Sequence, residues 1–494
     1  AECGYSYSIS QNGNFGVINN KEGKTVRHVG DPVVFSTGEF VIDDEDITIR
    51  TRKTVFSLQR HYSSEMGAEQ LSRYGMFGHG WASNLETRII AGYSQEAIDA
   101  LPVWEQYVAE LEAHDAQILE YLQEDSECSE IYAAMQSLLE TANSEFSQIN
   151  ALAQESEDKK TKNQFAAYGK PARYAENCGL DTVFYCQDDG SFLVFRKNSD
   201  NSYALTPAFP SCAVSLAVDT SGYCISYGET GEKRLYSEYG LPKCFTFKNG
   251  GKIEFFYDSA QKLKKITVDS VASLLFTWSG DRLASVRDER NGRTVTYDYA
   301  DKKLSSVRDW EGDCKKFVYN STDLLEKQIK ADSSFVAFEY ANSDGVYRTV
   351  KTTNEEGKSE YFHYDRENRT VVYIDYDGSP SLYAYDERGR TVHEEHADGT
   401  FTDYEYDDFN HLIAKKELNG KTEFVYDTSG RMIQKKYPDG SFEKWTYGTS
   451  GVSSFTDRDG VVQQYYYNAA HQMTDIFRAG SLLIHSEYNS DGSV

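Results

Sequence analysis

The 494-residue sequence lacks several features that would indicate particular classes of function. Lys and Arg are outnumbered by Asp and Glu, 51 to 78, which gives a formal net charge of −27. Phosphate binding depends on clustered Lys and Arg, so this balance argues against nucleic acid as a partner. Anionic membrane surfaces would repel the same charge. No stretch approaches the roughly 20 apolar residues that span a bilayer.

Common catalytic and metal-binding motifs are also missing. The chain contains no G-x-S-x-G, no P-loop and no H-E-x-x-H, and its eight cysteines include no C-x2-C pair. No residue therefore stands out as catalytic, cofactor-binding or metal-ligating, and we expect a protein that is not an enzyme and holds no cofactor. The N-terminal "AECGYSYSIS" has neither a basic nor an apolar segment, so a signal peptide is absent or already removed.

Four short motifs look like sites, but each has a simpler interpretation. "DTSG" at Asp219–Gly222 and Asp427–Gly430 resembles an aspartic-protease loop, yet the second copy is a turn of the repeat described below. In "HEEH", His393–His396, residues three apart on a strand face opposite sides, which favours a solvated strand. His79 in "GHGW" is expected in a turn. "DDED", Asp43–Asp46, could hold calcium, but it lacks the ligand spacing of a loop site, so a solvated turn is favoured.

What the sequence has in abundance is aromatic residues, with 37 Tyr and 26 Phe, together with 36 Gly. An aromatic residue recurs at a mean interval of 21 residues through the second half of the chain, and one interval, from Tyr340 to Tyr364, departs by more than one residue. We call these residues the motif aromatics. They are Tyr236, Tyr257, Trp278, Tyr299, Tyr319, Tyr340, Tyr364, Tyr385, Tyr406, Tyr426, Tyr447, Tyr467 and Tyr488.

Each interval carries two turn signals. About four residues after the motif aromatic comes a residue that tolerates positive φ: Gly240, Gly389, Gly430, Gly451 and Gly492, or Asp323, Asn368, Asn410 and His471. Seven residues before the next one stands an Asn-Gly or Asp-Gly pair at positions 249, 291, 377, 398, 439 and 459. Between the turns apolar and polar residues alternate with period two. The repeat is therefore predicted to be a β-hairpin.

A hairpin with one apolar face cannot bury that face alone, so consecutive hairpins are expected to stack edge to edge in one long antiparallel sheet. The motif aromatics would then form a ladder down the sheet and serve packing rather than ligand contact. A β-propeller is the rival architecture, but it predicts that odd and even repeats differ, and here they do not.

The sequence before the repeats does not show the 21-residue pattern. Residues 30–88 read as strands with Gly-rich turns, whereas apolar steps of three and four residues from Gln95 to about Lys162 predict two antiparallel helices, separated near Glu124–Glu127. This helical segment holds 16 acidic and 3 basic residues. A lid that packs its apolar stripe on the sheet is the favoured interpretation, and a projecting acidic arm is the alternative.

Cysteine usage leaves two possibilities open: buried thiols, or one to three disulfides in an exported protein. Cys224 and Cys244 lie one repeat apart, which places them two strand spacings, or roughly 9.5 Å, from each other. A direct bridge is therefore not expected, because it needs Cα atoms within about 7 Å.

At this point the residues resemble a known family. "YDERGR" from Tyr385 and "YDTSGR" from Tyr426 resemble the YD repeat of RHS proteins, whose relatives include wall-associated proteins, toxin-complex shell subunits and teneurins. "GDPVVFSTGEF", "RHYSS" and "GMFGHGWASN" resemble the domain that leads into those repeats. The resemblance covers about residues 30–93 and 180–494, and implies a sheet that spirals into a hollow shell, often around a C-terminal toxin, or that acts as an adhesive surface.

The chain departs from toxin-bearing relatives because it has no D-P-x-G self-cleavage motif and ends at "EYNSDGSV". We expect a mainly β protein: a leader β domain with an inserted helical hairpin, then an open spiral sheet of stacked hairpins. The expected divisions are an N-terminal segment 1–30, the leader domain 31–93 continuing at about 166–200, the insertion 94–165 and the hairpin array 201–494.

The expected function is a non-enzymatic scaffold, secreted, periplasmic or at the cell surface, for adhesion, display or shell formation. The alternatives are the shell part of a secreted polymorphic toxin and a glycan-binding module. The unpaired edge of an open sheet invites pairing with another chain, so we expect self-association or a protein partner through residues 465–494.

Overall fold

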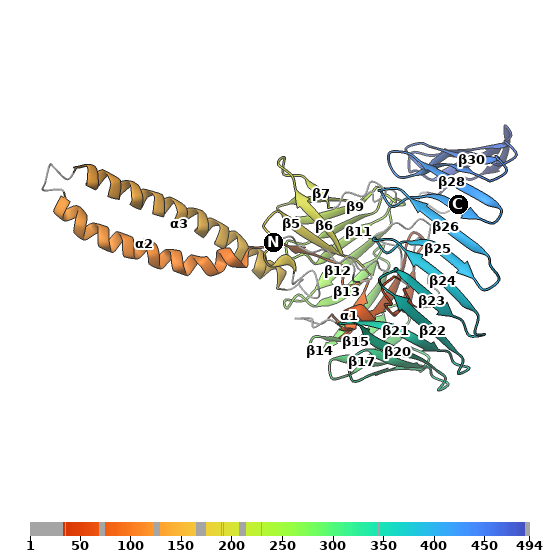
Figure 1. The fold of residues 1–494 in the computed structure, drawn as a ribbon. Coiled ribbons are helices and arrows are strands. Elements are labelled where there is room, and N and C mark those ends of the chain that lie inside the picture. The colour runs from red at the N-terminus through yellow and green to blue at the C-terminus, as the bar shows by residue number, and fades with distance from the viewer. Residues whose placement is uncertain are drawn as a thin grey trace.

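The computed structural model describes residues 33–34, 36–68, 75–122, 129–164, 174–188, 190, 192–206, 214–228, 230–343 and 345–489. The predicted N-terminal segment 1–30 lies outside these residues. The described chain is mainly β, as expected, with a leader domain, a helical arm and one long sheet (Figure 1).

The leader domain consists of two small antiparallel sheets and a short helix. The first sheet contains β1 (Val41–Arg50), β2 (Val55–Ser63) and β3 (Trp81–Ser83), with α1 (Ser64–Ala68) after β2. The second contains β4 (Arg88–Ala91), β5 (Thr182–Cys186), β6 (Phe192–Lys197) and β7 (Tyr203–Leu205). Because β4 pairs directly with β5, the helical segment between them is an insertion into one hairpin. The second sheet extends to Leu205, slightly past the predicted boundary at 200.

The long sheet, which we call the strip, follows the leader. Its strands are β8 (Val214–Asp219), β9 (Gly222–Tyr227), β10 (Lys233–Tyr236), β11 (Pro242–Thr246), β12 (Lys252–Tyr257), β13 (Leu263–Val268), β14 (Ala272–Ser279), β15 (Arg282–Asp288), β16 (Thr294–Ala300), β17 (Lys303–Arg308), β18 (Cys314–Tyr319), β19 (Leu325–Ile329), β20 (Phe335–Ser343), β21 (Val346–Thr353), β22 (Ser359–Asp365), β23 (Thr370–Ile374), β24 (Pro380–Tyr385), β25 (Thr391–His396), β26 (Phe401–Tyr406), β27 (Leu412–Glu417), β28 (Gly420–Tyr426), β29 (Met432–Lys436), β30 (Phe442–Tyr447), β31 (Val452–Thr456), β32 (Val462–Tyr467), β33 (Met473–Arg478) and β34 (Ser481–His485).

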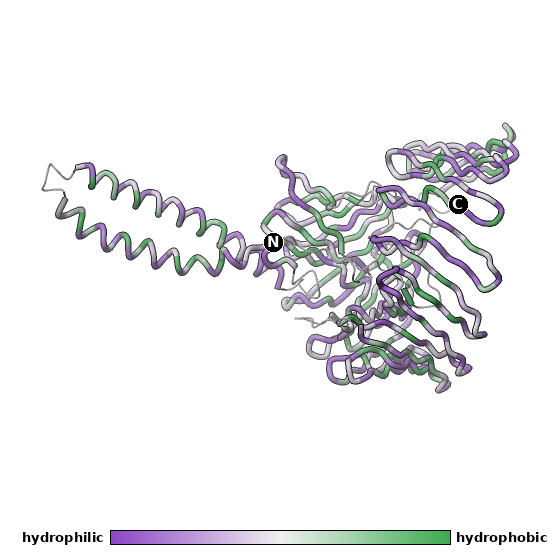
Figure 2. Tube along the Cα trace, viewed as in Figure 1, coloured by the Kyte–Doolittle hydropathy of each residue, from purple (hydrophilic) through white to green (hydrophobic). Residues whose placement is uncertain are grey.

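Every strand of the strip pairs antiparallel with its neighbours in sequence, which confirms the stacked hairpins and excludes separate propeller blades. Among the described residues, β8 pairs only with β9 and β34 only with β33, so the strip is open at both edges. Hydrophobic and hydrophilic residues alternate along the strands, as the period-two pattern requires (Figure 2). Alternation gives the strip one apolar face.

The apolar face of the first half of the strip is covered by the leader domain, which lies on its concave side (Figure 1). Leader and strip side chains form one hydrophobic core rather than two. Ring centroids of Phe40 and Phe338 lie 3.8 Å apart, and those of Trp81 and Phe317 lie 5.1 Å apart. The leader therefore fills the curve of the strip instead of merely preceding it.

The predicted turn residues adopt the expected backbone geometry with one exception. Positive φ is found at Gly389 (75°), Gly430 (76°) and Asn410 (71°), and at all six glycines of the Asn-Gly and Asp-Gly pairs. The prediction for Asn368 is wrong, because the positive φ of that turn falls on Arg369 (51°). Gly492 lies outside the described residues. Tight turns need this conformation, and glycine adopts it without steric cost.

The one irregular interval, from Tyr340 to Tyr364, is absorbed by a lengthened hairpin. β20 and β21 are longer than most strands of the strip, and β21 contacts the leader domain. The Thr349 amide donates a hydrogen bond to the Gly38 carbonyl at 2.8 Å. A Cβ on Gly38 would lie 2.7 Å from Cβ of Arg348, so only glycine permits this close approach.

The insertion forms two antiparallel helices, α2 (Gln95–Leu122) and α3 (Ser129–Asn163), which confirms the predicted hairpin. The favoured interpretation of a lid on the sheet is wrong. The helices pack on each other and project away from the strip as an arm (Figure 1). Small buried residues, Ala142, Ala153 and Ser156, let the helices approach closely, and the Asn163 side chain anchors the base of the arm by accepting a hydrogen bond from the Ala91 amide at 3.0 Å.

Because the arm contributes little to the common core, replacing residues 96–161 by a short Gly-Ser linker should cost less than about 1 kcal/mol of folding free energy. Urea denaturation followed by tyrosine fluorescence measures this change. Deleting the β14–β15 hairpin, which carries buried core residues, is the control and should prevent folding. Loss of the strip's cooperative transition in the arm deletion would contradict the independence of the arm.

Candidate functional site

The motif aromatics connect each hairpin to the one before it through a hydrogen bond. Ten of the thirteen donate their hydroxyl, or the indole N–H of Trp278, to a backbone carbonyl of the preceding repeat at 2.6–3.0 Å. Tyr447, for example, donates to Met432 O at 2.7 Å, and Tyr467 to Val452 O at 2.9 Å. The motif aromatics therefore pack in the sheet, as expected, and also hydrogen-bond to the backbone of the preceding repeat, which the sequence pattern does not reveal.

The accepting carbonyl always lies in the residue directly across the ladder from the preceding motif aromatic. Met432 pairs with Tyr426, and Val452 with Tyr447. In nearly every repeat a β-bulge falls immediately before this pair. A bulge disrupts the strand ladder locally, and the next repeat's aromatic supplies a hydrogen-bond donor at that place.

Three motif aromatics do not make this bond. Tyr236, the first, contacts the hydroxyl of leader residue Thr87 at 3.1 Å instead. Tyr385 follows Tyr364, whose pairing with β23 has no bulge, and no ladder bond from Tyr385 occurs among the described residues. At this one place in the described strip, the bulge and the ladder bond are both absent, which supports a link between the bulge and the bond. Nothing in the structure explains why Tyr257 also makes no such bond.

The other residues of the YD motif hold the turn. The side chain after the motif aromatic accepts hydrogen bonds from the amides two and four residues later, as Asp386 does from Arg388 (2.9 Å) and Arg390 (3.0 Å). Arg390 binds the Asp386 carboxylate with Nε and Nη2, both at 2.7 Å. Its guanidinium carbon lies 4.6 Å from the ring centre of Tyr406 in the next repeat. Each motif side chain thus has a structural contact.

Burial keeps the ladder hydroxyls protonated. It raises the pKa of Tyr426 to about 12, with a smaller contribution from the Asp407 charge, and raises the pKa of Tyr364 further. A neutral hydroxyl donates the ladder bond, whereas a tyrosinate could not. These tyrosines are therefore poor candidates for a general base near neutral pH.

Two arginines connect the leader domain to the strip, and the first, Arg60, corrects an expectation. Asp43–Asp46 do not form a solvated turn but lie in β1. Asp46 accepts two hydrogen bonds from Arg60, at 2.6 and 2.7 Å, and one from the Tyr297 hydroxyl of the strip at 2.9 Å. Arg60 is 1% exposed, and its guanidinium carbon lies 4.8 Å from the ring centre of Trp81. Burial would lower the pKa of Arg60, but the carboxylates of Asp46 and Asp44 hold it above its ordinary value.

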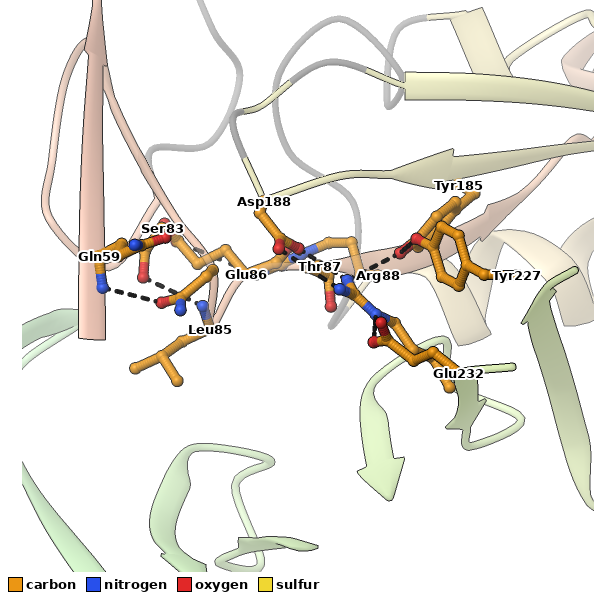
Figure 3. A network of polar contacts seen from close by, with 12 residues as sticks. Gln59, Ser83, Leu85, Glu86, Thr87, Arg88, Tyr185, Asp188, Tyr227 and Glu232 are labelled. Atoms are coloured by element: carbon orange, nitrogen blue, oxygen red, sulfur yellow. Dashed lines mark hydrogen bonds and ion pairs between the residues drawn. The ribbon is translucent and has the colours of Figure 1, made fainter. Parts of the chain in front are cut away.

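The second arginine, Arg234 on β10, lies against the other leader sheet. Its guanidinium donates to Asp188 at 2.8 Å, to the Tyr185 hydroxyl at 3.0 Å and to Glu232 at 2.7 Å. Figure 3 shows the side chains of Asp188, Tyr185, Tyr227 and Glu232 converging at this place. Burial raises the pKa of both tyrosines, so the cluster is a satisfied ion-pair network that joins two elements rather than an acid–base site.

The other motifs that look like sites in the sequence also make ordinary structural contacts. His79 lies in a turn, as expected, with its ring contacting the Gly67 carbonyl, and burial lowers its pKa. His393 and His396 lie on β25, as expected; His393 contacts Asp403 and His396 contacts Ser381, on separate neighbouring strands. Asp427–Gly430 is a repeat turn. In the part of the chain that the structure describes, no cluster of three or more His, Cys, Asp or Glu side chains could hold a metal ion.

Five cysteines are described, and no disulfide joins any two of them: Cys178, Cys186, Cys224, Cys244 and Cys314. Cys224 and Cys244 lie across from the same residue, Leu235, on opposite sides of β10, which confirms their separation by two strand spacings. Cys3, Cys128 and Cys212 lie outside the described residues. Neither described helix of the arm, nor α1, is long and apolar enough to cross a membrane.

Comparison with known families and structures gives limited matches. Residues 30–101 match the family described as "Domain of unknown function (DUF6531)". The chain is similar to a crystal structure of TcdB2-TccC3 without its hypervariable C-terminal region (13% identity, TM-score 0.40) and to that of TcdB2-TccC3-TEV (14%, 0.39), over 60% of this chain and 19% of each of those chains. The Photorhabdus luminescens Tc holotoxin pore carrying TccC3-D651A matches at 12% identity, covering 61% and 19% of the two chains, with a TM-score of 0.29. No curated protein matches.

Removing one ladder hydroxyl should weaken the strip. Tyr364→Phe leaves the Thr349 carbonyl without its 2.7 Å donor and should cost about 1–2 kcal/mol of unfolding free energy, measured by urea denaturation. Tyr385→Phe is a matched control in the next repeat, because its hydroxyl makes no ladder bond, and it should cost less. Equal losses in the two variants would contradict the hydrogen-bond ladder.

Breaking the buried ion pair should be more costly. Asp46→Asn leaves the Arg60 charge poorly compensated in the common core and should destabilise the protein by about 3–5 kcal/mol. Glu339→Gln, which removes the exposed partner of Lys351, is the control and should cost less than about 1 kcal/mol. A small effect of Asp46→Asn on the urea midpoint would show that Arg60 does not join the leader to the strip.

Proposed function

We propose that the chain is a non-enzymatic, exported scaffold of the RHS type, in which a curved wall of stacked hairpins builds a shell or displays a surface. The observation that carries this proposal is the structural use of the repeated motif. Tyr donates to the preceding repeat, Asp caps its own turn, and Arg joins that Asp to the ring of the following repeat. Because these contacts join each repeat to the next, the repeated motif serves to build a continuous wall of hairpins.

The C-terminal edge of the strip supports assembly with another strand. β34 presents three consecutive apolar residues, Leu482, Leu483 and Ile484, which are 54%, 59% and 48% exposed. Only β33 pairs with this strand among the described residues. An exposed apolar edge strand is a template for pairing, because its free N–H and C=O groups lack partners.

Light scattering against protein concentration tests this assembly. The chain should self-associate, and Leu483→Pro should reduce association because proline removes an edge donor and disfavours strand pairing. Val271→Lys, which removes a residue 68% exposed in the turn before β14, is the control for loss of apolar surface alone. A strict monomer at high concentration would overturn edge-mediated assembly.

The second candidate function, the shell part of a polymorphic toxin, is favoured by the inner aromatic stripe. Two residues before eleven of the thirteen motif aromatics, those from Tyr257 to Tyr467, stands another aromatic that faces the concave side. Those facing the first half of the strip are buried, such as Phe276 and Phe317, whereas the later ones, Tyr404, Phe424, Trp445 and Tyr465, are half-buried. An aromatic wall left partly open could cover an enclosed polypeptide.

Acrylamide quenching of Trp445 fluorescence distinguishes this candidate, in a chain in which Trp104 and Trp310 are replaced by Phe and Trp278 by Tyr, which keeps a ladder donor. Trp81 remains as a background signal, because it is 2% exposed. Trp445 should be accessible in the present chain and protected in a natural polypeptide that continues beyond Val494. Unchanged quenching in the longer polypeptide would exclude a cargo against this stripe.

A glycan-binding role would need aromatics outside the ladder, since ladder rings already contact the neighbouring repeats. Trp310 and Phe442 are 41% and 40% exposed and are suitable positions. A glycan array should respond to alanine substitutions there and not at motif positions if this role is correct.

A further inference from the structure

The repeat that begins at Tyr406 departs from the Y-D-x-x-G-R unit of the two repeats beside it, and a cavity lies at the changed position. Where the flanking repeats have Arg390 and Arg431, the repeat that begins at Tyr406 has His411. Arg431 binds Asp427 through Nε at 2.8 Å and Nη2 at 2.7 Å, and its guanidinium carbon lies 4.5 Å from the ring centre of Tyr447. In both flanking repeats a guanidinium thus lies between the Asp of its own turn and the tyrosine of the next repeat.

The shorter side chain of His411 occupies the inner part of this position, between Asp407 and Tyr426. Its Nδ1 lies 2.7 Å from Asp407 Oδ2, and its ring stacks on Tyr426 with 4.4 Å between centroids and 14° between planes. Arg390 reaches further, donating through Nη1 to the Asp407 carbonyl and to Asn410 Oδ1, both at 3.1 Å. Among the described residues, no group takes this outer position beyond His411.

Two features beside His411, a cavity and a buried nitrogen without a hydrogen-bond partner in the described part of the chain, indicate that a ligand can bind there. A cavity of about 470 Å³ opens there, lined by Asp407, Phe409, His411, Ile413, Phe424, Val425, Tyr426, Asp427 and Thr428. His411 is 6% exposed, and its Nε2 is buried without a hydrogen-bond partner among the described residues. A ligand that hydrogen-bonds to this buried nitrogen would remove the cost of leaving it unsatisfied.

The charge at this position favours a cation. Asp427 is neutralised by Arg431, whose hydrogen bonds keep the pKa of Asp427 below its ordinary value although burial opposes this. Asp407 has an imidazole as its partner instead of an arginine. A neutral imidazole that donates from Nδ1 to Asp407 carries no charge and leaves Nε2 as an acceptor. With His411 in this neutral form, the cavity combines a carboxylate, an acceptor nitrogen and aromatic side chains of Phe424 and Tyr426.

We propose that this cavity binds an organic cation with N–H donors, specifically a guanidinium group, which takes the outer position that corresponds to Nη1 of Arg390 in the preceding repeat. The N–H groups of the cation would donate to Nε2 of His411 and to backbone carbonyls of the next turn. Its planar face would pack on the aromatic side chains of Phe424 and Tyr426. The guanidinium could belong to a small molecule or to an arginine side chain of another polypeptide. This site is independent of the scaffold function, which does not require it.

Ligand-observed NMR with methylguanidinium tests the site, with methylurea as the neutral probe of similar shape. The wild-type chain should bind methylguanidinium saturably and methylurea at least tenfold more weakly. His411→Arg restores the motif, fills the cavity from within and should reduce binding at least tenfold while raising the thermal midpoint. His393→Arg adds the same charge on β25, outside the cavity, and should bind as the wild type does.

Equal binding of the two probes, or undiminished binding in His411→Arg, would overturn the proposal. Phe424→Leu is a second variant that removes an aromatic wall but keeps an apolar side chain, and it should weaken methylguanidinium binding. Comparison with acetyl-Gly-Arg-Gly-amide identifies the source of the ligand. Tighter binding of the peptide than of methylguanidinium indicates an arginine of a polypeptide, and equal binding indicates a small cation.

Discussion

At ten positions along the strip, a backbone carbonyl beside a β-bulge receives a hydrogen bond from outside the disrupted ladder, and this interaction governs the strip. The donor comes from the aromatic side chain of the next repeat, as Tyr426 supplies it to Leu412 O at 2.9 Å. Each hairpin therefore needs its successor for more than apolar burial. The interaction explains why Trp278 can replace tyrosine, since its indole N–H makes the same bond to Leu263 O at 2.7 Å.

A second constraint comes from the apolar face of the curved sheet, which would be exposed without a cover. The leader domain supplies that cover for the first half of the strip, and the ion pair of Arg60 with Asp46 lies at the contact, where Asp46 also accepts from Tyr297. Buried charges are stable only when they are paired and hydrogen-bonded. Leader and strip thus form one folding unit, whereas the arm of α2 and α3 stands outside it.

Periodicity in the sequence was sufficient to predict the hairpins, their turns and their stacking, because the period-two alternation and the Asn-Gly and Asp-Gly pairs act locally. The hydroxyl bonds of the ladder were not predictable, since they depend on bulges that no local signal marks. The Tyr297 partner of Asp46 is distant in sequence, so the local pattern of "DDED" predicts a turn where the structure has a strand. An apolar stripe does not reveal which surface it contacts, so the sequence of the arm predicts a lid equally well. His411 stands out only when its repeat is aligned with "YDERGR" and "YDTSGR".

Carbonyl NMR of protein labelled with [1-13C]methionine measures the ladder bond itself. The chain has five methionines, and two of them, Met432 and Met473, accept from Tyr447 and Tyr488. If the ladder is as described, Tyr447→Phe shifts the Met432 carbonyl resonance and leaves that of Met473 in place, and Tyr488→Phe does the reverse. A Met432 resonance that is unchanged in Tyr447→Phe would contradict the bond on which the description of the strip depends.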